Sequence, residues 1–482
     1  MSSVKKNLGY QTVYQILATC LPLITSPYLS RVLGAKQLGI YSFTNSVVLY
    51  FTLFAMLGTV NYGTRSIAAV KENSEKCAHT FWSIYLLQAG MALIAGTIYI
   101  LYYVFFCKEN RLIALIQMFQ IVNCFLDINW LFFGLEKFKV TVTRNLFVKL
   151  ACFSLLFVLV KTEEDLWKYA VLMVASNILS QLILWIKLPD FCRKPQKISA
   201  SDVKSHLRPN LVLFIPLLAM SVYHVMDKTM LGIMSTKEQV GYYYNADKLV
   251  NIPLTIINGV GTVMLPRITN LLANNKKDDA NHLFCISVEG VALASTAMAF
   301  GIAAVANEFV PLFFGRGFIA SISIAMVLSP VLVAKGISNT VRTEFLIPNR
   351  MESKFISSVI AGAITNLIAN IMLIPPLGGF GAAIGTLLAE IVACGWQIIA
   401  TWKKVDLKKT LLNSTFFVIA GAIMFLSVRC IAHYLTFGLI VSVLIEICVG
   451  VLVYGLIILL FMRATHNTLL KSFMRRSSHT AY

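Results

Sequence analysis

Long apolar runs, separated by short polar segments, fill almost the whole chain of 482 residues. A helix needs about 20 apolar residues to cross a membrane. The pattern therefore predicts about 14 membrane-spanning helices and no inserted soluble domain. The predicted spans are residues 8–33, 40–63, 81–106, 112–133, 145–161, 166–187, 209–234, 242–266, 283–306, 322–346, 355–376, 379–402, 410–430 and 437–462.

A short basic stretch near the middle, residues 187–208, divides the apolar runs into two groups. Its prolines, Pro189 and Pro195, prevent one continuous helix from passing through it. Lysine and arginine are frequent in this stretch, as they are in cytoplasmic loops of membrane proteins. We therefore expect a cytoplasmic linker between two membrane-embedded halves.

The two halves look like copies of each other. Gly39 and Gly241 precede the second apolar run of their halves, and Arg65 and Arg267 close the same two runs. The two glycines are as many positions apart as the two arginines. Two repeats in the same sense suggest a transporter with a site between its lobes. The expected domains are an N-terminal six-helix lobe at 1–186, the basic linker at 187–208, a C-terminal six-helix lobe at 209–402, and an extra helix pair with a basic cytoplasmic tail at 403–482.

Composition supports a polytopic all-α membrane protein, because 57% of the residues are hydrophobic and only 13% are charged. The 41 lysines and arginines exceed the 22 acidic residues, which in a soluble protein would favour nucleic-acid binding. Here the excess follows the rule that cytoplasmic loops are positive, so no nucleic-acid partner is expected. The charge alternation predicts that both termini lie in the cytoplasm.

Several charged residues lie inside the predicted spans, where each costs about 3 kcal/mol at a helix centre. Lys335, Asn339 and Arg342 share one helix face by their spacing, and Glu344 is poorly placed to neutralise both cations. An excess of cations in a cavity suits an anionic substrate such as a phosphate or pyrophosphate. The candidate substrate-binding residues are Lys335, Arg342, Asn339, Lys248, Lys149, Lys228 and Asn251.

Three aspartates within the spans, Asp127, Asp227 and Asp247, are candidates for binding a coupling ion. The latter two each precede a lysine, so pairing between helices is an alternative explanation for these charges. Lys149 lies near a cytoplasmic boundary, where its side chain could instead reach the interface.

The sequence contains none of the local motifs that mark common catalytic sites. H-E-x-x-H, G-x-S-x-G and the phosphate loop G-x-x-x-x-G-K-[ST] are all absent, and the ten cysteines form no C-x-x-C pair. We therefore expect no enzyme activity, no cofactor and no bound metal. The missing phosphate loop also argues against a self-contained ATP-driven pump.

Several stretches resemble the polysaccharide-transporter (Wzx-type) flippases of the multidrug/oligosaccharidyl-lipid/polysaccharide exporter superfamily. The motifs are loose, but they occur in order from about residue 8 to about residue 400. They lie at residues 27–35, 39–41, 127–139, 144–149, 227–232, 240–243, 265–267 and 378–390.

This resemblance implies two six-helix lobes in a V shape, followed by a C-terminal helix pair like that of the related lipid II flippases. It implies alternating-access transfer of an undecaprenyl-diphosphate-linked oligosaccharide across a bacterial cytoplasmic membrane. The product would be surface polysaccharide such as O-antigen, capsule or exopolysaccharide. The expected partners are that lipid-linked substrate, membrane lipids, a polysaccharide polymerase and a chain-length regulator.

Other functions remain as alternatives. A multidrug or cation antiporter of the same superfamily would favour an acidic cavity, against which the five cations in the spans argue. A lipid II flippase is a second alternative. A membrane glycosyltransferase or polymerase usually carries a large outer loop, which this chain lacks.

The predicted topology can be tested with reporter fusions placed after Lys197 and after Arg476. Both reporters should give the cytoplasmic signal, because an even number of spans returns the chain to its starting side. An external signal from either fusion would contradict the scheme.

Overall fold

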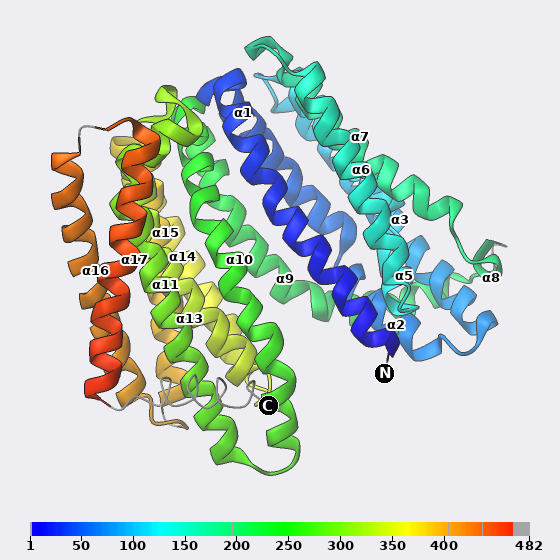
Figure 1. Cartoon of the computed structure of the whole chain (residues 1–482). Coiled ribbons are helices and arrows are strands. Elements are labelled where there is room, and N and C mark those ends of the chain that lie inside the picture. The colour runs from blue at the N-terminus through cyan, green and yellow to red at the C-terminus, as the bar shows by residue number, and fades with distance from the viewer. Residues whose placement is uncertain (1, 194–195, 403, 436, 466–482) are drawn as a thin grey trace. The chain divides into compact units, whose positions relative to one another are not determined.

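The computed structural model describes residues 2–193, 196–402, 404–435 and 437–465 (Figure 1). The side chains of residues 2–20, 216, 217, 219, 220, 222–224 and 262 lie outside this description. Within the described ranges all regular secondary structure is helical. The chain divides into two compact units, Met1–Gly241 and Tyr242–Tyr482.

In the residues that the structure describes, the first unit contains nine helices and the first turn of a tenth. α9 packs against α1, α2 and α3 within this unit. The helices are α1 (Ser2–Met56), α2 (Thr59–Val70), α3 (Ser74–Phe105), α4 (Arg111–Leu126), α5 (Asn129–Gly134), α6 (Phe138–Leu159), α7 (Leu166–Ile186), α8 (Asp190–Arg193) and α9 (Ala200–Met234), with a 3-10 turn at Glu163–Asp165.

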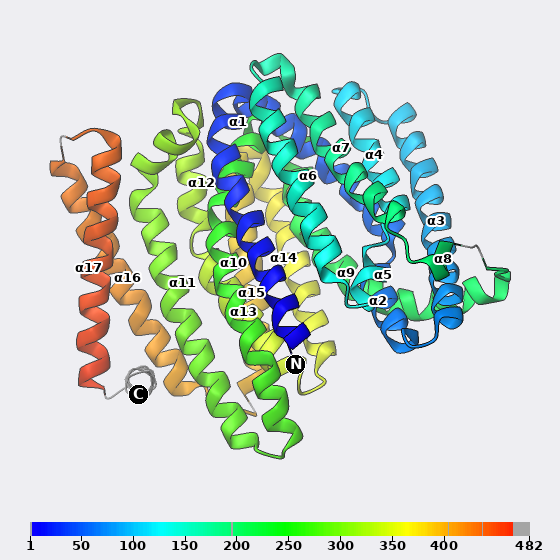
Figure 2. The ribbon, with the colours of Figure 1, turned by 45° about the vertical axis from the view of Figure 1, so that its right-hand side comes forward.

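The second unit begins inside α10. Its α16 and α17 lie side by side, as Figures 1 and 2 both show, and each also packs against α11. The helices are α10 (Lys237–Ala273), α11 (Lys277–Phe314), α12 (Ser321–Leu328), α13 (Val331–Thr340), a π-helical segment (Val341–Leu346), α14 (Glu352–Leu377), α15 (Gly379–Trp402), α16 (Lys408–Tyr434) and α17 (Leu439–Ala464), with a 3-10 turn at Arg316–Phe318.

Helices occupy all fourteen predicted spans, so the expected helical membrane fold is confirmed. Twelve segments of the described chain are long and apolar enough to cross a membrane, and one of them, Leu21–Val70, contains most of the first two predicted spans. The seventh predicted span lies in α9. The predicted domain boundaries and the V-shaped arrangement of lobes stay predictions.

Two helix boundaries differ from the predictions. The first two spans are separate helices within α1 that meet at a kink with no loop between them, because Gly34 has φ 70°, outside the helical region. α9 begins at Ala200, inside the predicted linker, because Ser199 and Asp202 form a capping box. The Ser199 hydroxyl accepts from the Asp202 amide at 3.2 Å, and the Asp202 carboxylate accepts from the Ser199 amide at 2.9 Å.

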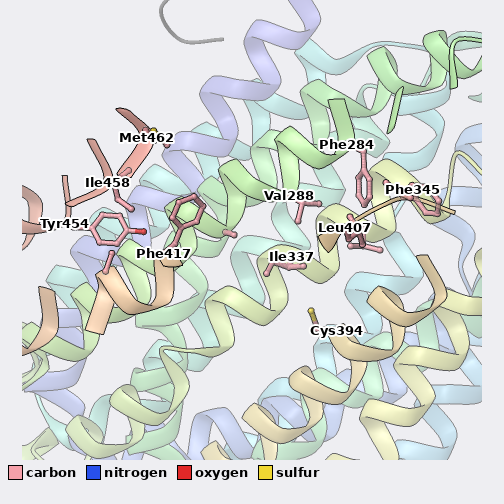
Figure 3. Close-up of a cluster of buried hydrophobic side chains, with 14 of the residues drawn as sticks. Phe284, Val288, Ile337, Phe345, Cys394, Leu407, Phe417, Tyr454, Ile458 and Met462 are labelled. Atoms are coloured by element: carbon pink, nitrogen blue, oxygen red, sulfur yellow. The ribbon is translucent and has the colours of Figure 1, made fainter. Parts of the chain in front are cut away.

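Each unit has its own apolar interior. In the first, Phe81, Trp130 and Leu184 belong to a cluster of fully buried side chains. In the second, Phe284 of α11, Phe417 of α16 and Tyr454 of α17 join one cluster that binds the C-terminal helix pair to the rest of the unit (Figure 3). Many large apolar side chains on the outer faces of the helices are exposed, as expected for helices that face lipid.

Two glycines at equivalent places of the sequence repeat pack closely in the first unit. A Cβ atom on Gly39 would lie 1.6 Å from the backbone oxygen of Lys237, and one on Gly241 would lie 2.0 Å from that of Ala35. These distances leave no room for any side chain, so α1 and the first turn of α10 approach through bare backbone.

Replacing Gly39 with alanine should therefore lower the stability of the protein by about 1–3 kcal/mol, because the backbones must move apart. Gly90→Ala in α3 is the matched control, since nothing lies within 4 Å of its Cβ position. Thermal unfolding in detergent measures both variants. Equal melting temperatures for the two variants would contradict the close contact.

Candidate functional site

The polar residues of α13 lie in the second unit. Lys335 forms an ion pair with Glu390 of α15, with Nζ 3.3 Å from Oε1 and side-chain exposures of only 12% and 6%. Glu344 is the carboxylate considered above as a neutralising residue, but the carboxylate paired with Lys335 is Glu390. This partner comes from a different helix, which spacing along α13 cannot reveal. A buried pair of this kind becomes costly if either charge is removed alone.

Asn339 links α13 to α10, because its amide donates to the side-chain oxygen of Asn258 at 2.8 Å. Arg342 is half-buried in the π-helical segment that follows. Its guanidinium lies 5.4 Å from the ring centroid of Phe355 on α14, at cation–π distance. The wider π-helical turn shifts Arg342 from the strict helical register assumed in the sequence, and such segments are frequent at functional sites.

The predicted residues of α10 interact locally. Lys248 lies over the Tyr244 ring at 4.0 Å, and the Asn251 amide donates to the Asp247 carboxylate at 2.7 Å. A hydrogen bond thus joins two of the predicted residues, Asp247 and Asn251, directly. The same helix bonds to α15, because the hydroxyls of Tyr243 and Thr386 lie 2.9 Å apart.

In the first unit, Asp127 occupies the break between α4 and α5. Its carboxylate accepts from the Asn129 backbone at 2.8 Å and from the Asn129 amide at 2.7 Å. Arg144 of α6, which is 5% exposed, donates to the Asn129 side chain at 3.0 Å and to the Ser180 carbonyl of α7 at 2.5 Å. Asp127 thus belongs to a partly buried polar network that links the α4–α5 break to α6 and α7.

Sequence reasoning missed most members of this network. Gln88 of α3 donates to the Asp127 carbonyl at 2.8 Å and accepts from the Trp130 indole at 2.9 Å. Gln181 of α7 accepts from Asn129 at 3.2 Å. The sequence does contain a signal for these members of the network, because a glutamine is unusual inside an otherwise apolar span. Arg144 was passed over because it falls one residue before a predicted span.

The remaining predicted residues also lie in the first unit. Lys149 is half-buried on α6, Lys228 is half-buried on α9, and Asp227 of α9 is buried. A common site formed by all ten predicted residues stays a prediction. Within the described ranges, no three His, Cys, Asp or Glu side chains gather closely enough to hold a metal ion.

Two family models match the chain. The model described as polysaccharide biosynthesis protein matches residues 4–272, and the model described as lipid II flippase MurJ matches residues 151–452. A curated protein of Escherichia coli (strain K12) named "Putative O-antigen transporter" is 26% identical over 404 residues, which cover 82% of this chain and 96% of that protein.

Solved structures share the fold. The lipid II flippase MurJ in an inward closed conformation matches with a TM-score of 0.79 and 16% identity, over 95% of this chain and 99% of that one. An inward-facing multidrug resistance MATE transporter of the MOP superfamily matches with a TM-score of 0.59 and 14% identity, over 80% of this chain and 99% of that one.

The family model for polysaccharide biosynthesis proteins covers more than half of the chain and begins near its first residue. The resemblance seen in the sequence motifs is thereby confirmed. The chain belongs to the polysaccharide biosynthesis protein family, and it has the membrane-transporter fold that lipid II flippase MurJ and the MATE transporters share.

Proposed function

We propose that this protein is a flippase that moves an undecaprenyl-diphosphate-linked oligosaccharide from the cytoplasmic to the outer leaflet by alternating access. The observation that carries the proposal is the polysaccharide biosynthesis family match, together with a relative named for O-antigen transport that aligns over 96% of its own length. The protein would serve surface polysaccharide biosynthesis, with both termini in the cytoplasm.

The charges of α13 and its π-helical extension support a role in holding the diphosphate. Lys335 already has Glu390 as a partner, so the diphosphate would have to replace that carboxylate. Arg342 rests against an aromatic ring and offers a planar fork that suits phosphate oxygens. Asn339, Lys248 and Asn251 would add polar contacts to the same substrate.

The first unit would contribute in a similar way. Lys149 and Lys228 are half-buried cations for the diphosphate, and Asp127, Asp227 and Asp247 are the carboxylates proposed to take up a coupling ion. The step is transport without a covalent reaction. A polysaccharide polymerase and a chain-length regulator are the proposed protein partners, since they would use the flipped lipid.

A lipid II flippase is a second candidate, because that family model matches residues 151–452. The two candidates differ in the sugar attached to the same diphosphate lipid. Restored surface polysaccharide in a strain lacking its own O-antigen transporter would favour the first. Rescue of a strain lacking its lipid II flippase, without restored polysaccharide, would favour the second.

Arg342→Ala should abolish polysaccharide export at unchanged protein level, because loss of a buried charged contact costs about 2–5 kcal/mol. Lys354→Ala on α14 is the matched control, since Lys354 is exposed. Polymer analysis and membrane immunoblots provide the two readouts. Normal export by Arg342→Ala would place the diphosphate contact elsewhere.

Lys335 needs a different design, because Lys335→Ala would leave Glu390 buried without its partner and cost about 3–5 kcal/mol. The double variant Lys335→Met with Glu390→Gln removes both charges. We expect it to reach the membrane at the normal level and to fail in export. Export by this double variant would show that the ion pair is structural.

Membrane potential should drive the transport, because a diphosphate carries negative charge outward from a negative interior. One charge gains about 2.3 kcal/mol per 100 mV. Flipping in proteoliposomes should follow the sign of an imposed potential without any ion gradient. A response to a proton or Na⁺ gradient alone, lost in Asp127→Asn, Asp227→Asn or Asp247→Asn, would establish ion exchange instead.

A further inference from the structure

A cavity of about 600 Å³ lies within the first unit, where residues of α1, α3, α4, α9 and the start of α10 surround it. All of its described lining residues precede Tyr242, so it belongs to that unit alone. None of the ten predicted site residues is part of this lining. Sites for small ligands usually have volumes of roughly 300–1,000 Å³, so the cavity is large enough to hold one.

Aromatic rings form much of the cavity wall, and packing holds them in place. The aromatic lining residues are Phe43, Tyr50, Phe51, Tyr99, Tyr102 and Phe106. Tyr99 of α3 is only 1% exposed, and its hydroxyl donates to the Ala114 carbonyl oxygen of α4 at 2.9 Å. The Phe51 ring of α1 packs edge-on against Tyr99, with ring centroids 4.9 Å apart. The Tyr102 ring lies 5.7 Å from that of Tyr99. The rings are therefore oriented before any ligand enters.

The mouth of the cavity lies at the loop that follows α3. Phe106 and Ile233 are 75% and 71% exposed, whereas Tyr99 is buried. Lys108 and Glu109 of this loop also line the cavity and are exposed. Charged groups at an entrance favour water over lipid tails as their surroundings. In the predicted topology this loop lies on the outer side of the membrane, so the cavity would open to the outer aqueous phase.

Lys237 brings a cation to the aromatic wall. Its half-buried ammonium lies 3.8 Å from the centroid of the Phe43 ring and donates to the Gly232 carbonyl oxygen at 2.6 Å. An ammonium has three N–H donors, and the carbonyl oxygen takes one of them. A ligand oxygen in the cavity can therefore accept a hydrogen bond from a cation that the protein already holds in position.

We propose that this cavity is a saccharide-binding site, which receives sugar units of the cargo on the outer side of the membrane. The C–H face of a sugar ring is weakly positive, so it packs against the negative face of an aromatic ring. Sugar oxygens would accept from Lys237, and sugar hydroxyls would donate to Glu109. The inference rests on the proposed function for the identity of the cargo, but saccharide binding can be measured apart from transport.

Two other kinds of ligand fit the cavity less well. A lipid tail would contact the rings, but it would remove water from Lys237 and Glu109 without replacing their hydrogen bonds. A free phosphate would bind the lysine, but it would make no use of the aromatic wall. A sugar satisfies both the rings and the charged groups.

Cys107 provides a reporter for the position of the mouth, because it is a half-buried lining residue with a free thiol. A membrane-impermeant maleimide should modify Cys107 in right-side-out membrane vesicles, as measured by peptide mass spectrometry. Modification of Cys107 in inside-out vesicles alone would overturn the outer position of the site.

Protection of Cys107 in the purified full-length protein measures binding. The probes are the soluble oligosaccharide released by mild acid from the lipid-linked repeat unit of the source strain, the soluble disaccharide-peptide of lipid II, inorganic pyrophosphate, and phosphatidylglycerol vesicles. We expect the oligosaccharide to slow the modification, and pyrophosphate and the vesicles to leave it unchanged.

The outcomes separate this inference from the proposed function. Protection by the lipid II disaccharide-peptide alone would support a saccharide site and contradict the proposed cargo. Absence of protection by both saccharides, in a protein that restores polysaccharide export, would overturn the saccharide site and leave the proposed function standing. Protection by pyrophosphate or by the vesicles alone would also overturn the saccharide site.

Substitutions at Tyr102 test whether the sugar stacks on the aromatic wall. Tyr102→Ala should weaken oligosaccharide binding about tenfold, whereas Tyr102→Phe, which keeps the ring, should bind almost as the wild type does. Tyr103→Ala is the matched control, because the neighbouring Tyr103 ring lies 4.8 Å from the Arg111 guanidinium and is not part of the described lining. Wild-type binding by Tyr102→Ala, or an equal loss in Tyr103→Ala, would overturn the proposal.

Discussion

The cost of charge and of unpaired polar groups in an apolar surrounding is the constraint on which the structure depends. A polar group without a partner loses several kcal/mol in hydrocarbon, so the described chain satisfies its backbone within helices. The same cost governs the side chains. Lys335, Arg144 and Arg429 are each held by oxygen atoms from a helix other than their own. These cross-helix contacts fix which helices are neighbours in each unit.

The fold could be predicted from the sequence because its signals are local. A run of about 20 apolar residues identifies a span wherever its neighbours lie. The errors arose where local geometry departs from that rule. At Gly34 a kink joins the first two helices directly, without the short segment that was expected between them. The Ser199–Asp202 capping box starts α9 before its apolar run begins. Both features depend on backbone conformation rather than on hydropathy.

The candidate site could be predicted only in part, for a related reason. Spacing shows which residues share a helix face, as it does for Lys335 and Asn339. It does not show which residues of other helices contact that face. Glu390 stands in another helix and Asn258 in a third, so neither contact has a signature in the local pattern. The polar network around Asp127 likewise draws its members from four helices. Partners distant in sequence require the fold to be known.

The Lys335–Glu390 pair shows how the same constraint can serve a carrier. A cation kept ready for a diphosphate would be costly in an empty, apolar surrounding, and a carboxylate partner removes much of that cost. If the diphosphate binds Lys335 as proposed, it would compete with Glu390, and part of its binding energy would be offset. Weaker net binding suits a protein that has to release its cargo on the other side. Glu390 would therefore lower the affinity for substrate while keeping the empty carrier stable.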